Sequence, residues 1–153
     1  MKTEFDHISG QKNQLGPHRV DIKNWLSCAP FEQLLNMEID DISAGRATLS
    51  MPFLAKYCQG LGLLHGGALT SLADTAVAFA CKSLLAEGTF FATVSLTSTF
   101  LAPVRQGIVT AHAQVVFSGE RSLDGKAMVV DSRGREVMSF TSLFRVSRRN
   151  HDL

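Results

Sequence analysis

The sequence predicts an α+β domain in which one apolar helix packs against an antiparallel sheet, and two observations carry this prediction. Residues Ala68–Ala86 contain neither glycine nor proline, are rich in good helix formers, and place apolar side chains on nearly every side of a helix. The segments that follow alternate between apolar and polar residues, as strands do. A helix that is apolar on nearly all sides needs cover on those sides, so we expect a curved sheet wrapped around it.

Shorter elements are expected before this helix. Residues 1–20 are polar and have the character of a flexible lead. The apolar spacing in Ile22–Asn36 fits one or two short helices, interrupted at Pro30. Met37–Met51 is expected to form two extended pieces around a turn at residues 43–45, because its apolar residues alternate with polar ones.

Strands are expected after the helix, which should stop at Gly88. The residue pairs 118–119, 124–125 and 133–134 each contain glycine and have the chemistry of turns. The expected strands are Phe91–Leu101, Gly107–Phe117, Ala127–Asp131 and Arg135–Val146. The domain is therefore expected to span residues 21–147, followed by a tail at 148–153.

Composition limits the classes of function. The chain has 153 residues, of which 45% are hydrophobic and 19% charged, so it can bury a core and is not intrinsically disordered. Its net charge of +1 gives no electrostatic footprint for nucleic acid or for an anionic membrane. We therefore expect a soluble protein without nucleic-acid or membrane partners.

The cysteines and the N-terminal residues indicate a compartment. Cys28, Cys58 and Cys81 form no C-x-x-C pair, which argues against a zinc or dithiol site, and their odd number suits a reducing environment. The N-terminal segment lacks the apolar stretch of a secretory signal, and the apolar run Ala76–Cys81 is too short to span a membrane. A cytoplasmic location is expected.

A glycine-rich segment, Tyr57–Gly67, leads into the helix and ends in His65-Gly66-Gly67. The first turn of a helix has unsatisfied N–H groups and a partial positive charge. Two glycines at this point let an atom approach the backbone closely, so the helix start can bind an anion or a developing oxyanion. The alternative is a tight loop that needs glycine only for positive φ.

Asp74 is the second candidate, because it lies inside the apolar helix. None of the residues three or four positions away is basic, so no salt bridge along the helix accounts for it. A carboxylate in apolar surroundings requires hydrogen bonds, a partner or a function. It either reaches solvent or nearby hydroxyl groups, or serves as a general base or nucleophile of raised basicity.

The spacing of these two candidates implies a dimer. Gly66 and Asp74 are eight residues apart, which is about 12 Å along a helix. A base and an oxyanion donor must both lie within ~3 Å of the reacting atoms, so one helix cannot supply both to one carbonyl. If both act, Gly66 of one chain must face Asp74 of another across a two-fold axis.

These residues carry a resemblance to a known family. The sequence HGGALTSLADTA at residues 65–76, followed by a strand that ends in FLAP at residues 100–103, resembles the hotdog-fold acyl-CoA thioesterases, in particular the phenylacetate-degradation thioesterase branch. The match covers roughly Phe31 to Val146. The resemblance implies an antiparallel sheet wrapped around one long helix, and a homo-oligomer that is a dimer or, more usually, a dimer of dimers. It implies no metal and no redox cofactor.

The resemblance also implies roles for particular residues. The Gly66 N–H would polarise the thioester carbonyl, with Gly67 beside it in the substrate-binding loop. Asp74 of the partner chain would activate water or attack the carbonyl directly. His65 would orient the loop or contact the thioester, and a role as a loop-stabilising hydrogen-bond donor is equally open.

Two further positions depart from the family pattern. Gln59 stands where the family often has asparagine, which keeps the amide but moves it by one methylene, ~1.3–1.5 Å. Thr93 stands where a related branch uses a serine on the strand after the helix to position water, so the hydroxyl is retained. The arginines at 105, 121, 133 and 135 are candidates to hold the phosphates of coenzyme A, and the sequence does not choose among them.

The expected function is hydrolysis of an acyl-CoA thioester to a carboxylic acid and free thiol. The main alternative is a non-hydrolytic acyl-CoA-binding sensor, against which the presence of Asp74 argues, since binding alone needs no buried base. A dehydratase of the same fold is a second alternative. Dehydratase chemistry on this fold goes with a histidine and an aspartate in the loop before the helix, an arrangement that this sequence lacks.

Overall fold

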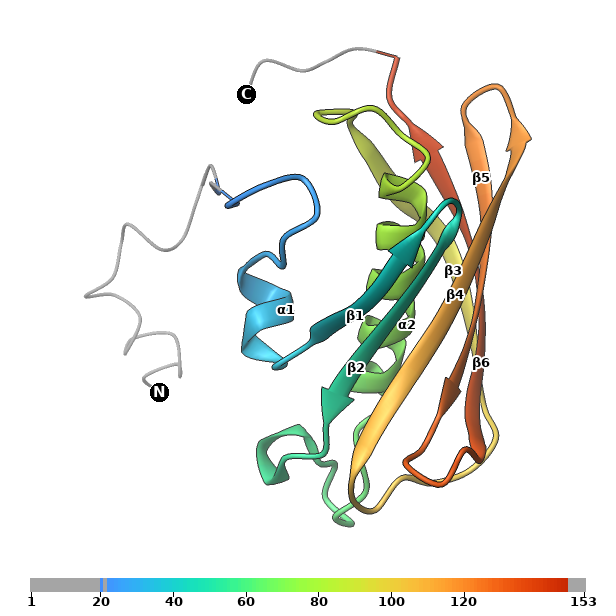
Figure 1. The fold of residues 1–153 in the computed structure, drawn as a ribbon. Coiled ribbons are helices and arrows are strands. Elements are labelled where there is room, and N and C mark those ends of the chain that lie inside the picture. The colour runs from blue at the N-terminus through green and yellow to red at the C-terminus, as the bar shows by residue number, and fades with distance from the viewer. Residues whose placement is uncertain (1–19, 21, 149–153) are drawn as a thin grey trace, which may run out of the picture.

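One long helix lies across the concave side of an antiparallel sheet (Figure 1). The computed structural model describes residue 20 and residues 22–148. The expected lead (1–20) and tail (148–153) lie outside this range except for Val20 and Arg148. The elements in chain order are α1 (Pro30–Leu34), β1 (Glu38–Ser43), β2 (Arg46–Pro52), the 3₁₀ turn η3 (Ala55–Tyr57), α2 (Gly66–Lys82), β3 (Phe91–Phe100), β4 (Ile108–Gly119), β5 (Ser122–Val130) and β6 (Glu136–Val146).

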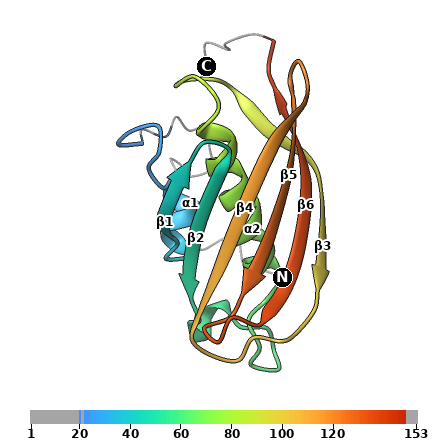
Figure 2. The ribbon, with the colours of Figure 1, turned by 45° about the vertical axis from the view of Figure 1, so that its right-hand side comes forward.

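The six strands form one sheet in the order β1-β2-β4-β5-β6-β3, and all neighbours are antiparallel (Figure 2). The strand that follows α2 thus does not join β2. It crosses to the far side and pairs with β6, which makes β3 an edge strand. The expected fold class, a curved antiparallel sheet around one central helix, is confirmed.

The core forms between α2 and the inward residues of the sheet. On β4, alternate side chains are buried (Val109, Ala111, Ala113 and Val115), which is the pattern expected for a strand with one face on a core. They meet the face of α2 that carries the fully buried Leu72, Ala76 and Val77. The small residues of the helix allow the backbone of the sheet to approach it closely.

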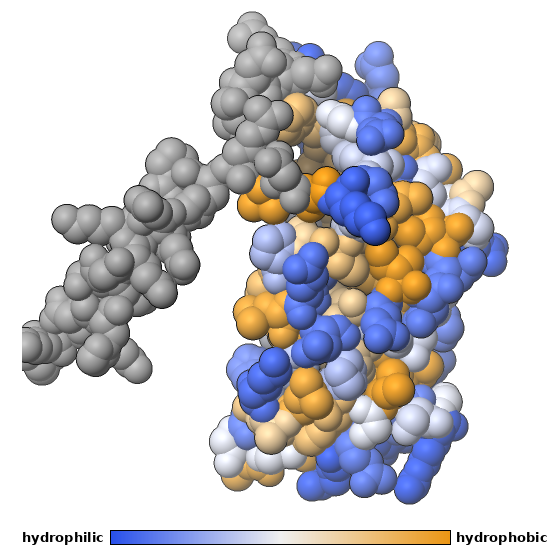
Figure 3. Space-filling view, turned by 60° about the vertical axis from the view of Figure 1, so that its left-hand side comes forward, coloured by the Kyte–Doolittle hydropathy of each residue, from blue (hydrophilic) through white to orange (hydrophobic). Residues whose placement is uncertain are grey.

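The helix is not covered all round, which corrects the expectation of complete burial. A stripe of α2 that recurs at helical spacing remains partly exposed and contains Gly67, Thr70, Ser71, Asp74 and Ala78. The sheet curves around the other sides only. The surface of the side on which α1 lies mixes apolar with hydrophilic side chains (Figure 3). The open stripe is where the functional candidates of the helix lie.

Three expected boundaries in the helical regions were wrong. Pro30 does not interrupt a helix but begins α1, because proline at the first helical position loses no hydrogen bond. The central helix includes Gly66 and Gly67, which were expected in the loop, and it ends at Lys82 rather than near Gly88.

Contacts from distant segments explain this early end. The Ser83 hydroxyl donates to the Ala80 carbonyl and accepts from the Gly45 N–H in the β1–β2 turn. The Trp25 indole N–H donates to the Lys82 carbonyl, and Lys82 Nζ donates to the Trp25 carbonyl. These bonds satisfy the C-terminal end of the helix without a glycine cap.

The expected turn at 124–125 was also wrong, because both residues lie inside β5. The β4–β5 turn is made by residues 120–121. Gly125 faces the helix so closely that a Cβ there would lie 2.1 Å from Cγ1 of Val77. The glycine therefore marks close packing of strand on helix rather than a change of direction. Phe117, near the end of β4, lies beside a register shift and is 52% exposed.

Gly125→Ala is expected to destabilise the fold by about 1–3 kcal/mol, because the added methyl group overpacks the contact with Val77. Urea denaturation measures the loss. Gly119→Ala is the matched control, because a Cβ there meets only ordinary contacts at 3.8 Å. Combining Gly125→Ala with Val77→Ala should recover part of the loss, and equal stabilities of Gly125→Ala and Gly119→Ala would contradict the packing argument.

Candidate active site

The start of α2 is capped by His65. This residue has extended backbone geometry, and its Nδ1 accepts a hydrogen bond of 2.8 Å from the Gly67 N–H. Serine, threonine, aspartate and asparagine are the usual residues at such a position. Because Nδ1 accepts, the ring proton of the neutral imidazole lies on Nε2. His65 thus caps the helix through an acceptor atom, not as the hydrogen-bond donor considered from the sequence.

The Gly66 N–H is the one free donor of this first turn within the described residues. The His65 carbonyl accepts from the N–H groups of Ala68 and Leu69, and His65 Nδ1 accepts from that of Gly67. No acceptor in the described range serves the Gly66 N–H. A free donor at the positive end of a 17-residue helix is suited to an oxygen atom that carries negative charge.

A pocket of about 430 Å³ opens beside this donor. It is lined by Gly66 with residues of the preceding loop and of the segment after β3: Gln59, Leu63, Leu64, Leu69 and residues 100–104. Its lining carries no charged side chain. A Cβ on Gly66 would lie 2.9 Å from Cζ of Phe100, so only glycine at this position leaves room for the Phe100 ring beside the helix start. Gln59 shares the pocket, and its Oε1 accepts from the Leu61 N–H.

Gly67 is required for a different reason. A Cβ there would lie 2.9 Å from His65 Nδ1 and would displace the imidazole from its capping position. The two glycines therefore serve two functions at the helix start. Gly66 leaves room at the pocket, and Gly67 leaves room for the cap.

Asp74 lies two turns further along the open stripe. Its carboxylate accepts the Thr93 hydroxyl, with distances of 3.0 Å to Oδ1 and 3.2 Å to Oδ2. Burial raises the pKa of Asp74 above its ordinary value, and the hydrogen bond from Thr93 opposes this effect. A carboxylate of raised basicity that is held in place by a hydroxyl group has the properties of a general base.

Helix α2 and edge strand β3 meet along a seam of three contacts. Asp74 meets Thr93 at one end, and Gly66 meets the Phe100 ring at the other. In the middle, the hydroxyl groups of Thr70 and Ser98 are 2.9 Å apart. The residue numbers rise along the strand as they fall along the helix, so the two elements run antiparallel.

The predicted site residues form two groups within one chain. Gly66, Gly67, His65 and Gln59 lie together at the helix start, whereas Asp74 and Thr93 lie together at the other end of the seam. Eight helical residues separate Gly66 from Asp74, about 12 Å. A single chain does not bring the donor and the carboxylate to one reacting atom.

Sequence reasoning missed the Phe100 ring against Gly66 and the hydroxyl pair of Thr70 and Ser98. A signal existed, because Ser98 and Phe100 are two residues apart on a strand and so share one face. The sequence did not reveal that this face meets the helix start. Which strand lies beside α2 depends on the crossover of β3 to β6.

The described residues contain no group of three or more His, Cys, Asp or Glu side chains placed to hold a metal ion. Cys81 is fully buried, and burial followed by the nearby Asp74 charge raises the pKa of its thiol to about 12. Such a thiol is a poor nucleophile. Cys28 and Cys58 are free and partly buried.

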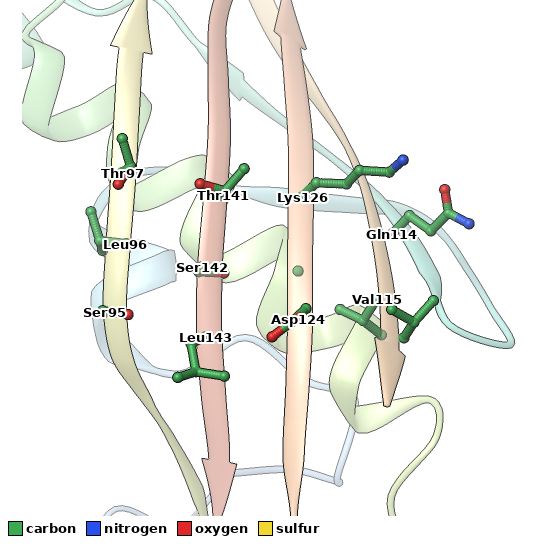
Figure 4. A pocket seen from close by; sticks show the side chains of 12 residues that line it. Ser95, Leu96, Thr97, Gln114, Val115, Asp124, Lys126, Thr141, Ser142 and Leu143 are labelled. Atoms are coloured by element: carbon green, nitrogen blue, oxygen red, sulfur yellow. The ribbon is translucent and has the colours of Figure 1, made fainter. Parts of the chain in front are cut away.

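A second pocket, of about 480 Å³, lies away from these residues (Figure 4). It is formed by β3, β6, β5 and β4, and the side chains of Lys126, Asp124 and Gln114 stand over its strands. On β4, β5 and β6, exposed or partly exposed residues alternate with buried ones that face α2. The pocket shares no residue with either group of the candidate site.

Comparison with known proteins assigns the family. An antiparallel sheet around one long helix, with a free donor at the helix start, defines a protein of the hotdog class. The sequence profile of the Thioesterase superfamily matches residues 61–138, which include all of these site residues except Gln59. The chain belongs to the thioesterase superfamily and is a thioester hydrolase.

Individual relatives agree with this assignment. The chain is 33% identical over 94 residues to the proofreading thioesterase EntH of Klebsiella pneumoniae, covering 61% of this chain and 69% of that protein. It is 34% identical over 107 residues to the acyl-coenzyme A thioesterase PaaI of Escherichia coli, covering 69% and 74%. These relatives support membership of the phenylacetate-type branch.

Solved structures share the fold. The E. coli PaaI structure superposes with a TM-score of 0.70 at 30% identity, covering 76% of this chain and 83% of that one. A conserved protein from Pseudomonas aeruginosa, PA5202, gives a TM-score of 0.77 at 25% identity and covers 82% and 100%. Within the described part of this chain, no helix has both the length and the apolar character needed to cross a membrane.

The raised pKa of Asp74 predicts a pH dependence of stability. The folded state binds the proton more tightly than the unfolded state, so the free energy of unfolding falls as the pH rises from 3.8 through the folded-state pKa. Asp74→Asn removes this loss. Its stability relative to the wild type should therefore grow over that window and level off above it, as measured by urea denaturation at fixed protein concentration.

Asp131→Asn is the control of opposite sign. The Arg135 N–H, together with the Arg133 N–H and the Arg135 guanidinium, holds the pKa of Asp131 below its ordinary value despite some opposing desolvation. The ionised Asp131 carboxylate therefore stabilises the folded state. Relative to the wild type, the free energy of unfolding of Asp131→Asn should fall as the pH rises towards neutral. If the difference in free energy of unfolding between Asp74→Asn and the wild type did not change with pH, a raised pKa of Asp74 would be contradicted.

Proposed function

We propose that this protein hydrolyses acyl-CoA thioesters at a site that two subunits share. The observation that carries the proposal is the geometry of α2. Its free Gly66 N–H and its basic Asp74 carboxylate lie on one open seam but about 12 Å apart. Each group has the chemistry that thioester hydrolysis requires, and neither can complete the site within its own chain.

Edge strand β3 supplies a way to bring the two groups together. Thr93 marks the position of Asp74 along this strand, and Phe100 marks that of Gly66. If two copies of β3 pair antiparallel about a point near residues 96–97, Thr93 of one chain lies opposite Phe100 of the other. Asp74 of each subunit then approaches Gly66 of its partner, and the two-fold axis generates two equal sites.

The surface of β3 supports this pairing. The strand is an unpaired edge in the sheet, and such edges are usually covered or protected. It also exposes large apolar side chains, Val94 at 59%, Phe100 at 54% and Leu96, and the residue after the strand, Leu101, is exposed as well. Pairing would satisfy the edge hydrogen bonds and cover these side chains. Further assembly into a dimer of dimers follows from the resemblance to the family.

The proposed chemistry uses the two groups in turn. The thioester carbonyl oxygen accepts the Gly66 N–H, which stabilises the negative charge that develops on that oxygen. Asp74 of the partner subunit takes a proton from water as the water oxygen bonds to the carbonyl carbon. The C–S bond then breaks, the thiolate leaves and takes up a proton, and the carboxylic acid is released. Burial makes Asp74 the stronger base that this step needs.

The remaining candidates position these groups. The Thr93 hydroxyl donates to both oxygens of Asp74 and so fixes the orientation of the base. Nδ1 of His65 is occupied by the Gly67 N–H, which favours the loop-orienting role over a role as a base. Gln59 lines the pocket beside Gly66, where its amide can contact the substrate. The E. coli relative is named an acyl-coenzyme A thioesterase, which supports coenzyme A as the thiol.

Replacing Gly66 tests the oxyanion donor. Gly66→Pro deletes the N–H at the first helical position, where proline is tolerated, and the extended backbone of His65 suits a following proline. Gly66→Ala is the matched control, because it adds a similar steric load near Phe100 but keeps the N–H. In a thiol-release assay, kcat of Gly66→Pro should fall roughly 10²–10³-fold below that of Gly66→Ala. Equal rates would show that the N–H takes no part.

Mixing two inactive variants tests the shared site. Subunits with Asp74→Asn still supply Gly66, and subunits with Gly66→Pro still supply Asp74. Random pairing makes half of the dimers mixed, and each mixed dimer contains one intact site, so activity should return to roughly a quarter of the wild-type value. The variants are unfolded and refolded together, with separately refolded variants as controls. No recovery in verified mixed dimers would show that each site is built from a single chain.

A further inference from the structure

A third pocket, distinct from that of Figure 4, lies at the same end of the molecule as Gly66 and differs in chemical character from the pocket at Gly66. Its volume is about 430 Å³, and it lies between the β3–β4 connection and the β5–β6 connection. Both connections lie at the end of the sheet near the start of α2 (Figures 1 and 2). The lining residues are Pro103, Val104, Arg105, Gln106, Asp131, Ser132, Arg133 and Arg135. Three guanidinium groups against one carboxylate leave this arginine pocket with a surplus of positive charge.

The two connections are fixed against each other, so the arginine pocket is preformed. Arg135 donates to the Pro103 carbonyl at 2.9 Å and forms an ion pair with Asp131 at 3.1 Å. Gly107 has a positive φ of 85°, and a Cβ there would lie 2.6 Å from the Ser132 hydroxyl. A side chain at 107 would therefore strain the backbone and displace the Ser132 hydroxyl.

Arg105 and Arg133 are left with uncommitted charge. Arg135 is held by Asp131 and Pro103, whereas no hydrogen bond or ion pair in the described part of the chain engages the guanidinium of Arg105 or of Arg133. Both side chains belong to exposed residues. Two free guanidinium groups on a preformed wall are suited to phosphate oxygens, which they can bind through paired N–H donors.

The arginine pocket adjoins the pocket at Gly66. Pro103 and Val104 line both. The Val104 carbonyl also accepts from the Leu64 N–H, which ties this segment to the loop that leads into α2. The surface thus changes from an uncharged lining at Gly66 to a cationic one within a few residues. A ligand that matches it has an uncharged reacting end and an anionic far end.

We propose that the arginine pocket binds the phosphate groups of the nucleotide end of the acyl-CoA substrate, with Arg105 and Arg133 as their ligands. This inference rests on the proposed function, because it extends the same substrate away from Gly66. Phosphate on a pantetheine arm also occurs in acyl-carrier proteins, which present a single phosphodiester. Two uncommitted arginines fit the several phosphates of coenzyme A better, and we commit to coenzyme A.

Truncated substrates test the arginine pocket. For the Arg105→Ala/Arg133→Ala variant, KM for an acyl-CoA should rise about tenfold, since each exposed ion pair contributes only a few-fold. KM for the corresponding N-acetylcysteamine thioester, which has no phosphate, should stay at the wild-type value. Arg46→Ala is the matched control, an exposed arginine on β2 outside both pockets. An unchanged KM for acyl-CoA, or an equal rise for both substrates, would overturn the proposal.

The source of the phosphate is tested with an acyl-carrier protein and with an acyl-3′-dephospho-CoA. If the pocket binds the nucleotide end, the double substitution should raise KM for acyl-CoA by a larger factor than KM for either of these substrates. A larger effect on the acyl-carrier protein than on acyl-CoA would overturn it. Added NaCl should raise the wild-type KM for acyl-CoA and change that of the double variant much less, because salt screens exposed charges.

A binding measurement separates this inference from the proposed function. Calorimetry with adenosine 3′,5′-bisphosphate should show binding to the wild type and a loss of about tenfold in affinity for Arg105→Ala/Arg133→Ala. Binding of this nucleotide without hydrolysis of any thioester would retain the phosphate site and reject the hydrolase. Hydrolysis without nucleotide binding would retain the hydrolase and reject the phosphate site.

Discussion

The antiparallel course of α2 and β3 is the constraint on which the rest of the site depends. Because the helix and the edge strand run in opposite directions, each position along one is matched to a position along the other, with Gly66 at Phe100 and Asp74 at Thr93. The helical rise fixes the distance between the two functional groups, and no local adjustment shortens it. A two-fold operation on the exposed edge is the simplest way to join groups that one rigid helix holds apart.

The helix supplies the two electrostatic properties that the proposed chemistry needs, one at its start and one in its middle. At its start, aligned peptide dipoles and the free Gly66 N–H favour negative charge, and the His65 cap leaves this single donor open. In its middle, burial makes the Asp74 carboxylate a stronger base, while Thr93 limits the shift and fixes the orientation. Both properties depend on the close cover of the sheet over the other faces of the helix.

Much of the fold could be predicted from the sequence, because periodicity reports which side of an element is buried. The long central helix, the strands and the position of Asp74 on that helix follow from apolar spacing. The errors came from long-range contacts. Gly125 has the local chemistry of a turn, yet it lies within β5. Glycine is required there because the Val77 side chain of α2 occupies the position that a Cβ would take. Ser83 ends the helix through a bond to Gly45, which is 38 residues away.

By itself, the sequence determined the chemical types and their spacing: a histidine and two glycines that lead into an apolar helix, and an aspartate eight residues beyond Gly66. These are local properties, fixed by covalent order and helical geometry. Only the tertiary structure decided that Phe100 walls the pocket at Gly66. It also decided that the Arg135 guanidinium binds Asp131 and the Pro103 carbonyl, while those of Arg105 and Arg133 have no partner among the described residues. Those facts join segments that approach each other only once the sheet has closed around the helix, and spacing along the chain carries no information about them.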